Sequence, residues 1–113
     1  ESDRYREFKA LRERWLRDCR TDVSVAAMAA EVHLSPERFA ALYRKFFGIT
    51  PYAAVLEARL LTARRLLHTG SLSVKEIAGR CGWEDEHYFS RLFKRKIGLA
   101  PGEFRRRQSG AAR

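Results

Sequence analysis

The chain has 113 residues, a length that suits one small domain or two very small units around a hydrophobic core. Hydrophobic residues make up 45% of it, which argues against general disorder, and no apolar run approaches the roughly 20 residues that a membrane span needs. Lys and Arg outnumber Asp and Glu by 23 to 14, so we expect a polyanionic partner, either nucleic acid or an anionic membrane surface.

The cysteines and histidines predict no metal site. Cys19 and Cys81 lie far apart, each in a helical pattern, and the chain has no Cys-x-x-Cys motif. The three histidines also lack the spacing of metal ligands. We therefore expect no metal and no cofactor, and both thiols should be reduced and packed in a cytoplasmic protein. No signal peptide is recognisable, because the start of the chain is mostly charged.

The first part of the chain predicts three helices. Residues 5–19 carry apolar side chains at intervals of three and four, as in an amphipathic helix. Ser24 is placed to cap a short second helix. Ser35 and Pro36 suit the N-cap and the first position of a third helix, which should end at Gly48.

The middle of the chain predicts a long helix and then a short one. The long helix should run from Pro51 to Leu67, with Gly70 as a left-handed residue just beyond its end. Ser73 and Glu76 have the spacing of a capping box, which predicts the start of the short helix.

The last part of the chain completes an all-helical pattern. Asp85 is placed to cap a helix that ends at Gly98. Residues 101–107 predict one further helical turn, and residues 109–113 should be frayed.

An internal repeat carries the functional argument. Ala29 corresponds to Ala78 at a spacing of 49 residues, whereas Phe39 corresponds to Phe89 at a spacing of 50. Each copy is a short helix, a tight turn and a longer helix that ends in Gly-x-x-Pro, which is the helix-turn-helix arrangement. We therefore predict an all-α fold with two helix-turn-helix subdomains. They comprise residues 1–50 and residues 70–113, the latter with a C-terminal helix and tail, joined by a linker helix over 51–69.

The longer helix of each copy has an apolar and a polar side, which a rotation of 100° per residue separates. A helix fits the DNA major groove, where each base pair shows a distinct pattern of donors and acceptors. Arg91 can bind O6 and N7 of guanine, whereas Ala41 offers only a methyl group, so the second copy should discriminate more strongly between bases. The residues expected at phosphates are Ser35, Arg38, Arg44, Lys45, Lys94 and Arg95.

The second copy contains Gly82-Trp83-x-Asp85, then Tyr88-Phe89-x-Arg91-x-Phe93-Lys94, and then Gly98-x-x-Pro101. This pattern resembles the signature of the AraC/XylS family of bacterial transcription regulators, and the resemblance extends over nearly the whole chain. It implies about seven helices, with two recognition helices in successive segments of the major groove. The residues that the resemblance places at bases are Glu37, Ala40, Ala41, Glu86, His87, Ser90 and Arg91.

Two departures from the family pattern matter. His87 stands where a serine is common, which leaves the preferred base sequence open. Leu61 stands where a polar residue is usual, and we expect its side chain to be exposed.

The resemblance implies double-stranded DNA and RNA polymerase as partners, with an effector or dimerisation domain outside this chain and no membrane. We expect no catalytic residues, because no nucleophile–base pair, acidic pair or phosphate-binding glycine loop stands out. The alternatives are a nonspecific basic nucleic-acid-binding module and an anionic-surface-binding module. RNA binding is disfavoured, because the aromatic residues lie on the apolar sides of the helices rather than on an exposed platform.

Overall fold

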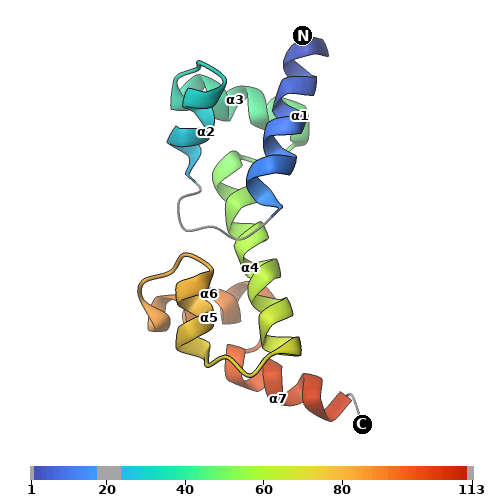
Figure 1. Cartoon of the computed structure of the whole chain (residues 1–113), viewed down its shortest axis with the longest axis vertical. Coiled ribbons are helices and arrows are strands. Elements are labelled where there is room, and N and C mark those ends of the chain that lie inside the picture. Colours follow the sequence, from blue (N-terminus) through green and yellow to red (C-terminus); the bar gives the residue numbers. More distant parts are fainter. Residues whose placement is uncertain (1, 18–23, 112–113) are drawn as a thin grey trace. The chain divides into compact units, whose positions relative to one another are not determined.

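The computed structural model describes residues 2–17 and 24–111, with side chains up to residue 108. Over these ranges the protein consists of seven α-helices without a strand, which confirms the all-α prediction (Figure 1). The helices are α1 (Ser2–Leu16), α2 (Val25–Glu31), α3 (Pro36–Phe47), α4 (Pro51–Thr69), α5 (Val74–Arg80), α6 (Glu86–Ile97) and α7 (Pro101–Ala111).

The chain divides into two compact units, Glu1–Ala58 and Arg59–Arg113. The division lies inside α4, so each unit includes part of that helix. Unit 1 contains the pair α2 and α3, and unit 2 contains the pair α5 and α6 (Figure 1). Each unit therefore holds one copy of the sequence repeat.

Aromatic rings from two helices form the centre of unit 1. The ring centroids of Phe8 in α1 and Phe39 in α3 lie 5.0 Å apart, and those of Tyr43 and Phe47 lie 4.7 Å apart. Full burial of such a side chain contributes about 1.5–3 kcal/mol to the stability of the fold. The buried aliphatic residues of this core are Leu11, Met28, Ala29, Val32, Ala54 and Val55.

Polar contacts also join α1 to α2. The carboxylate of Glu31 accepts hydrogen bonds from the guanidinium of Arg14 and from Nε1 of Trp15. These two bonds, that of Arg14 first, lower the pKa of Glu31 below its ordinary value. The end of α2 is therefore tied to α1 by a charged carboxylate at neutral pH.

A chain of aromatic contacts forms the core of unit 2. Trp83 packs on Phe89 with 4.9 Å between ring centroids, and Phe93 lies 5.7 Å from Phe89 and 5.6 Å from Phe104. Cys81, two residues before Trp83 in the sequence, is also fully buried. The prediction that Trp83 and Cys81 serve packing agrees with their burial.

The predicted helix caps are present in both units. The hydroxyl of Ser24 accepts a hydrogen bond from the Ala27 amide at 3.1 Å, and that of Ser35 accepts one from the Arg38 amide. Ser73 forms the complete capping box with the side chain of its third helical residue. Local capping residues thus set the starts of α2, α3 and α5.

Three helices differ at their ends from the sequence prediction. Gly70 is not left-handed; its amide bonds to the Leu66 carbonyl at 3.2 Å, so helical hydrogen bonding continues up to this residue. Helix α1 begins at Ser2, where Asp3 in the first turn favours a helix N-terminus, and it ends at Leu16; Cys19 lies outside the described residues. Helix α7 continues through Ala111 instead of ending near residue 107.

Candidate nucleic-acid interface

The two helix-turn-helix turns share one backbone design. His33 in unit 1 and Gly82 in unit 2 both have positive φ, at 62° and 95°. The following residue closes each turn in the same way, since the Leu34 amide bonds to Ala29 at 3.0 Å and the Trp83 amide bonds to Ala78 at 2.9 Å. The sequence repeat is therefore also a repeat of local structure.

On helix α3, the core residues and the predicted contact residues lie on different sides. Phe39 and Tyr43 are fully buried, and they anchor one side of the helix in unit 1. Ala40 is half-buried at the edge of this side. The exposed residues of the opposite side are Glu37, Arg38, Ala41, Arg44 and Lys45, with the capping Ser35 also exposed.

Helix α6 has the same two-sided arrangement as α3, but its predicted contact side chains are more polar. Phe89, Leu92 and Phe93 are buried, whereas Glu86 and Ser90 are half-buried. Among the predicted contact residues of this helix, the exposed ones are His87, Arg91, Lys94 and Arg95. The helical periodicity predicts His87, Ser90, Arg91, Lys94 and Arg95 on or beside the polar side, and the resemblance adds Glu86; the structure places each at the surface or at its edge.

The start of α6 is held by a carboxylate. Oδ1 of Asp85 accepts hydrogen bonds from the amides of Tyr88 and His87, at 3.2 and 2.8 Å. These bonds lower the pKa of Asp85, with the contact to Tyr88 as the largest cause. Two amides at this helix N-terminus are therefore already bonded to a charged side chain of the protein.

The structure also exposes an aromatic residue on α6 that the sequence prediction did not assign to the interface. Tyr88 is 44% exposed in the first turn of α6. The repeat contained the signal for it, because Tyr88 occupies the position of Arg38 in the first copy. Residue type alone does not reveal this exposure, because tyrosine is intermediate between buried and exposed residues.

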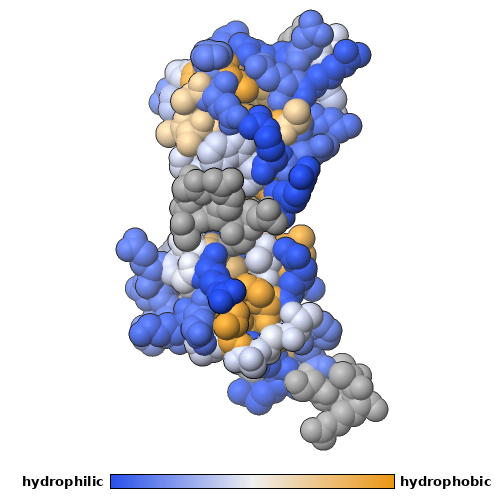
Figure 2. Space-filling model, viewed as in Figure 1, coloured by the Kyte–Doolittle hydropathy of each residue, from blue (hydrophilic) through white to orange (hydrophobic). Residues whose placement is uncertain are grey.

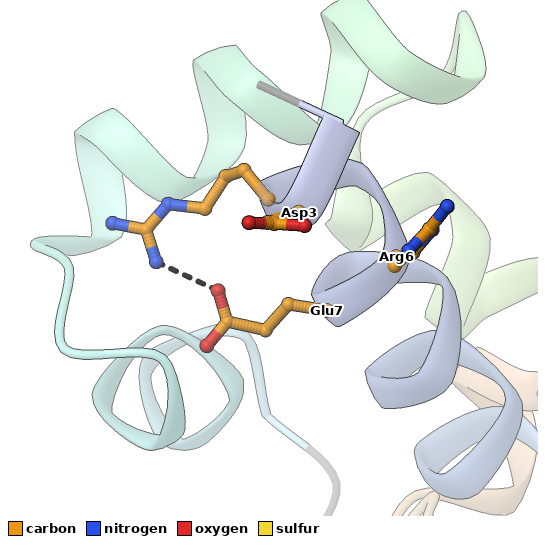
Figure 3. A pocket seen from close by; sticks show the side chains of 4 residues that line it. Asp3, Arg6 and Glu7 are labelled. Carbon is orange, nitrogen blue, oxygen red and sulfur yellow. Dashed lines mark hydrogen bonds and ion pairs between the residues drawn. The ribbon is translucent and has the colours of Figure 1, made fainter.

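One hollow of the surface lies at the start of α1 and is lined by charged residues. This shallow pocket of about 690 Å³ is lined by Asp3, Arg4, Arg6 and Glu7 (Figure 3). Arg4 and Glu7 form an ion pair of 2.8 Å there, so the charges are mixed and partly paired. Figure 2 shows a largely hydrophilic surface with smaller apolar areas on the visible face.

Residues 2–17 and 24–111, which the structure describes, contain neither a metal-binding cluster nor a membrane-spanning helix. No group of His, Cys, Asp and Glu side chains in these ranges could hold a metal ion. None of the helices in the same ranges combines the length and the apolarity that a membrane crossing requires.

Comparisons with known proteins agree with the repeat. A helix-turn-helix domain family matches residues 28–107. The arabinose operon regulatory protein of Escherichia coli (strain K12) is 34% identical over 85 residues, which are 75% of this chain and 29% of that protein. The transcriptional activator RhaS of Escherichia coli O139:H28 is 35% identical over 97 residues, 85% of this chain and 35% of RhaS. This chain thus spans about a third of the length of these curated relatives.

A solved structure supports the same likeness. The DNA-binding domain of AdpA, a global transcriptional factor crystallised in complex with a target DNA, superposes with a TM-score of 0.79 and is 29% identical. The match covers 95% of this chain and 94% of that chain.

Proposed function

Because this chain belongs to the AraC/XylS family of helix-turn-helix transcription regulators, we propose that it binds double-stranded DNA sequence-specifically and thereby regulates transcription. The observation that carries the proposal is the repeated design of α3 and α6. Each is a helix of 12 residues whose aromatic side is buried and whose cationic side is exposed. Such a helix fits the major groove, and its exposed side chains meet base edges there.

In this proposal α6 provides most of the base discrimination. Arg91 is exposed near the middle of the helix, where a guanidinium binds O6 and N7 of guanine with two hydrogen bonds. His87 lies one turn before it, and Ser90 is its neighbour; both can donate or accept. The half-buried Glu86 completes the base-facing group in unit 2.

Helix α3 has fewer groups that distinguish bases. Ala40 and Ala41 offer methyl groups, which suit apolar contact with thymine. Glu37 can accept a hydrogen bond from cytosine N4, but its charge repels nearby phosphates. We therefore propose that unit 1 contributes affinity and a weaker sequence preference.

Phosphate contacts come from the later turns of both helices and from the starts of α3 and α6. Their side chains are exposed, and phosphate contacts orient a protein on DNA without selecting the sequence. We assign this role to Ser35, Arg38, Arg44, Lys45, Lys94 and Arg95, and we add Tyr88 because of its exposure.

We also propose that α4 serves as a linker between two DNA-binding subdomains, residues 1–50 and 70–113, with the linker over 51–69. Its 19 residues form a helix about 28 Å long. Successive major-groove segments on one face of DNA are about 34 Å apart. A linker of this length favours a site in which both recognition helices enter the groove on neighbouring turns.

The longer relatives suggest the remaining partners. Because the chain spans about a third of their length, we propose that an effector or dimerisation domain accompanies this one in the full protein. RNA polymerase is the proposed partner at promoters, and the cytoplasm is the proposed location.

Selection of bound duplexes from a random pool tests the proposal directly. We expect an enriched, nonpalindromic motif of roughly two helical turns, with more fixed positions in the half bound by α6. Binding to the selected site should weaken by ~10³–10⁵ between 50 and 200 mM salt, as expected for ~6–10 phosphate contacts. No enriched motif at low salt would contradict specific recognition.

The net charge of +9 favours one other candidate function, nonspecific binding to polyanions. A nonspecific nucleic-acid-binding module would bind scrambled duplexes as tightly as the selected site, and an anionic-surface module would bind acidic vesicles without binding duplexes. Equal affinity for selected and scrambled duplexes would therefore support the alternative.

A further inference from the structure

The guanidinium of Arg59 packs directly on the turn between α5 and α6. A Cβ atom built on Gly82 would lie 2.9 Å from Cζ of Arg59 and 3.2 Å from its Nε and Nη1 atoms. Real Cβ atoms essentially never approach other heavy atoms to less than 3.0 Å. The space that a side chain at position 82 would need is therefore filled by Arg59.

The first copy of the repeat shows that the backbone conformation alone does not require glycine here. His33 occupies the same position of its turn, with φ of 62°, and carries an exposed side chain. Histidine is among the residues that tolerate this left-handed region. Gly82 differs from His33 because a cationic side chain occupies the space beside it.

Contacts connect this turn to the proposed base-binding side of α6. The Trp83 amide closes the turn on the Ala78 carbonyl at 2.9 Å, and the Trp83 ring packs on Phe89 of α6. Phe89 lies two residues after His87 and two before Arg91, on the buried side of the helix. A shift of the turn would therefore change the direction in which α6 presents its polar side chains.

We infer that Arg59 is a positioning residue for base recognition by α6, acting through its packing against Gly82. The effect on base recognition rests on the proposed DNA-binding function, whereas the packing of Arg59 against Gly82 can be tested without DNA. Arg59 acts through the shape of its planar end group as well as its charge. Lysine keeps the charge but lacks the planar group.

The first experiment measures amide hydrogen exchange of the free protein. In Arg59→Ala, exchange at the Trp83 amide should become about tenfold faster, because the turn opens locally more often. The Leu34 amide, which makes the equivalent bond to Ala29 in unit 1, should be unaffected. Unchanged exchange at Trp83, or equal acceleration at Leu34, would overturn the inference.

A glycine pair provides the matched control. Gly82→Ala introduces a Cβ at φ of 95° against Arg59, whereas Gly98→Ala introduces one at φ of 101° with nothing within 4 Å. Both variants strain the backbone, but only the first displaces the guanidinium, which can move because it ends a flexible side chain. Gly82→Ala should therefore accelerate Trp83 exchange more than Gly98→Ala does. When both substitutions are made in the Arg59→Ala background, this difference between them should disappear. Equal effects of the two glycine variants would overturn the inference.

The second experiment compares binding to duplexes that carry base changes in one half-site at a time. Arg59→Ala should lose about tenfold in discrimination at the half bound by α6 and keep discrimination at the other half. Arg59→Lys should recover nonspecific affinity but not this discrimination. If lysine restores both, Arg59 is a phosphate contact and the inference is wrong. If the wild type selects no duplex, the proposed function fails, whereas the exchange experiment still decides whether Arg59 positions the turn.

Discussion

Oδ1 of Asp85 accepts a hydrogen bond from the amide of His87 at 2.8 Å, which ties the N-cap of α6 to a residue proposed to face bases. The same oxygen accepts a bond from the Tyr88 amide. One exposed carboxylate thus fixes the first turn of α6, and with it the position of His87 on that helix. In unit 1 a neutral hydroxyl, that of Ser35, performs the equivalent capping.

We predict that Asp85→Ala lowers the melting temperature of unit 2 by about 4 °C or more, because two first-turn amides lose their acceptor. Asp85→Asn should lose less, since its side-chain oxygen can still accept from the same amides. Thermal unfolding in a Trp15→Phe background follows unit 2 alone, because Trp83 is then the only tryptophan. An Asn variant as unstable as the Ala variant would contradict capping by hydrogen bonds.

The acid stability of unit 2 should reflect two capping carboxylates. Backbone hydrogen bonds, from Tyr88 to Asp85 and from Ser73 to Glu76, are the leading causes that hold both pKa values below their ordinary range in the folded protein. The unfolded chain therefore takes up protons first as the pH falls. Stability should be nearly constant from pH 7 to 5 and should decline below about pH 4, through the lowered folded-state pKa values.

The control for this pH dependence is the double variant Asp85→Asn and Glu76→Gln, which cannot titrate at either cap. Its melting temperature, followed from pH 7 to 2.5, should decline less steeply in acid than that of the wild type. A decline as steep as in the wild type would assign the acid sensitivity to other carboxylates.

Arg91→Ala should relax selectivity at one base pair and cost about 1–3 kcal/mol in binding to the selected site. Lys94→Ala is the matched charge control on the same helix, and its exposed ammonium is proposed to contact phosphate. It should weaken binding to all duplexes alike and reduce the salt dependence by about one phosphate contact. Competition titrations with single-base variants of the site distinguish the two. A uniform loss for Arg91→Ala would make it a phosphate contact.

Phe104→Ala should destabilise unit 2 by about 3 kcal/mol, since it removes a buried ring from contact with Phe93. Leu61→Ala on α4 is the control, because Leu61 is 56% exposed and its loss should change stability by less than about 0.5 kcal/mol. Urea unfolding in the Trp15→Phe background, followed by Trp83 fluorescence, measures both. Similar losses for the two variants would contradict the assignment of Phe104 to the core.

Local interactions explain why so much of this fold could be predicted. Ser24, Ser35, Ser73 and Asp85 cap helices within three residues of themselves, and apolar periodicity identified the buried sides of α3 and α6. The exposure of Leu61, expected from the sequence, is also observed. Periodicity also placed most of the interface residues on the polar sides, whereas the base-facing set follows from the family resemblance, and the contacts of all these residues with DNA remain predictions.

The sequence by itself determined the all-α class, the duplicated helix-turn-helix design and the polar sides of the two long repeat helices, because each depends on side chains a few positions apart. Only the tertiary structure decided that Gly70 stays out of the left-handed region, that the division into units lies inside α4, and that Arg59 fills the space beside Gly82. The division into units and the contact of Arg59 depend on which segments meet after the chain has folded. The residues around Gly82 in the sequence do not indicate that the guanidinium of Arg59, which lies in α4, will pack beside it.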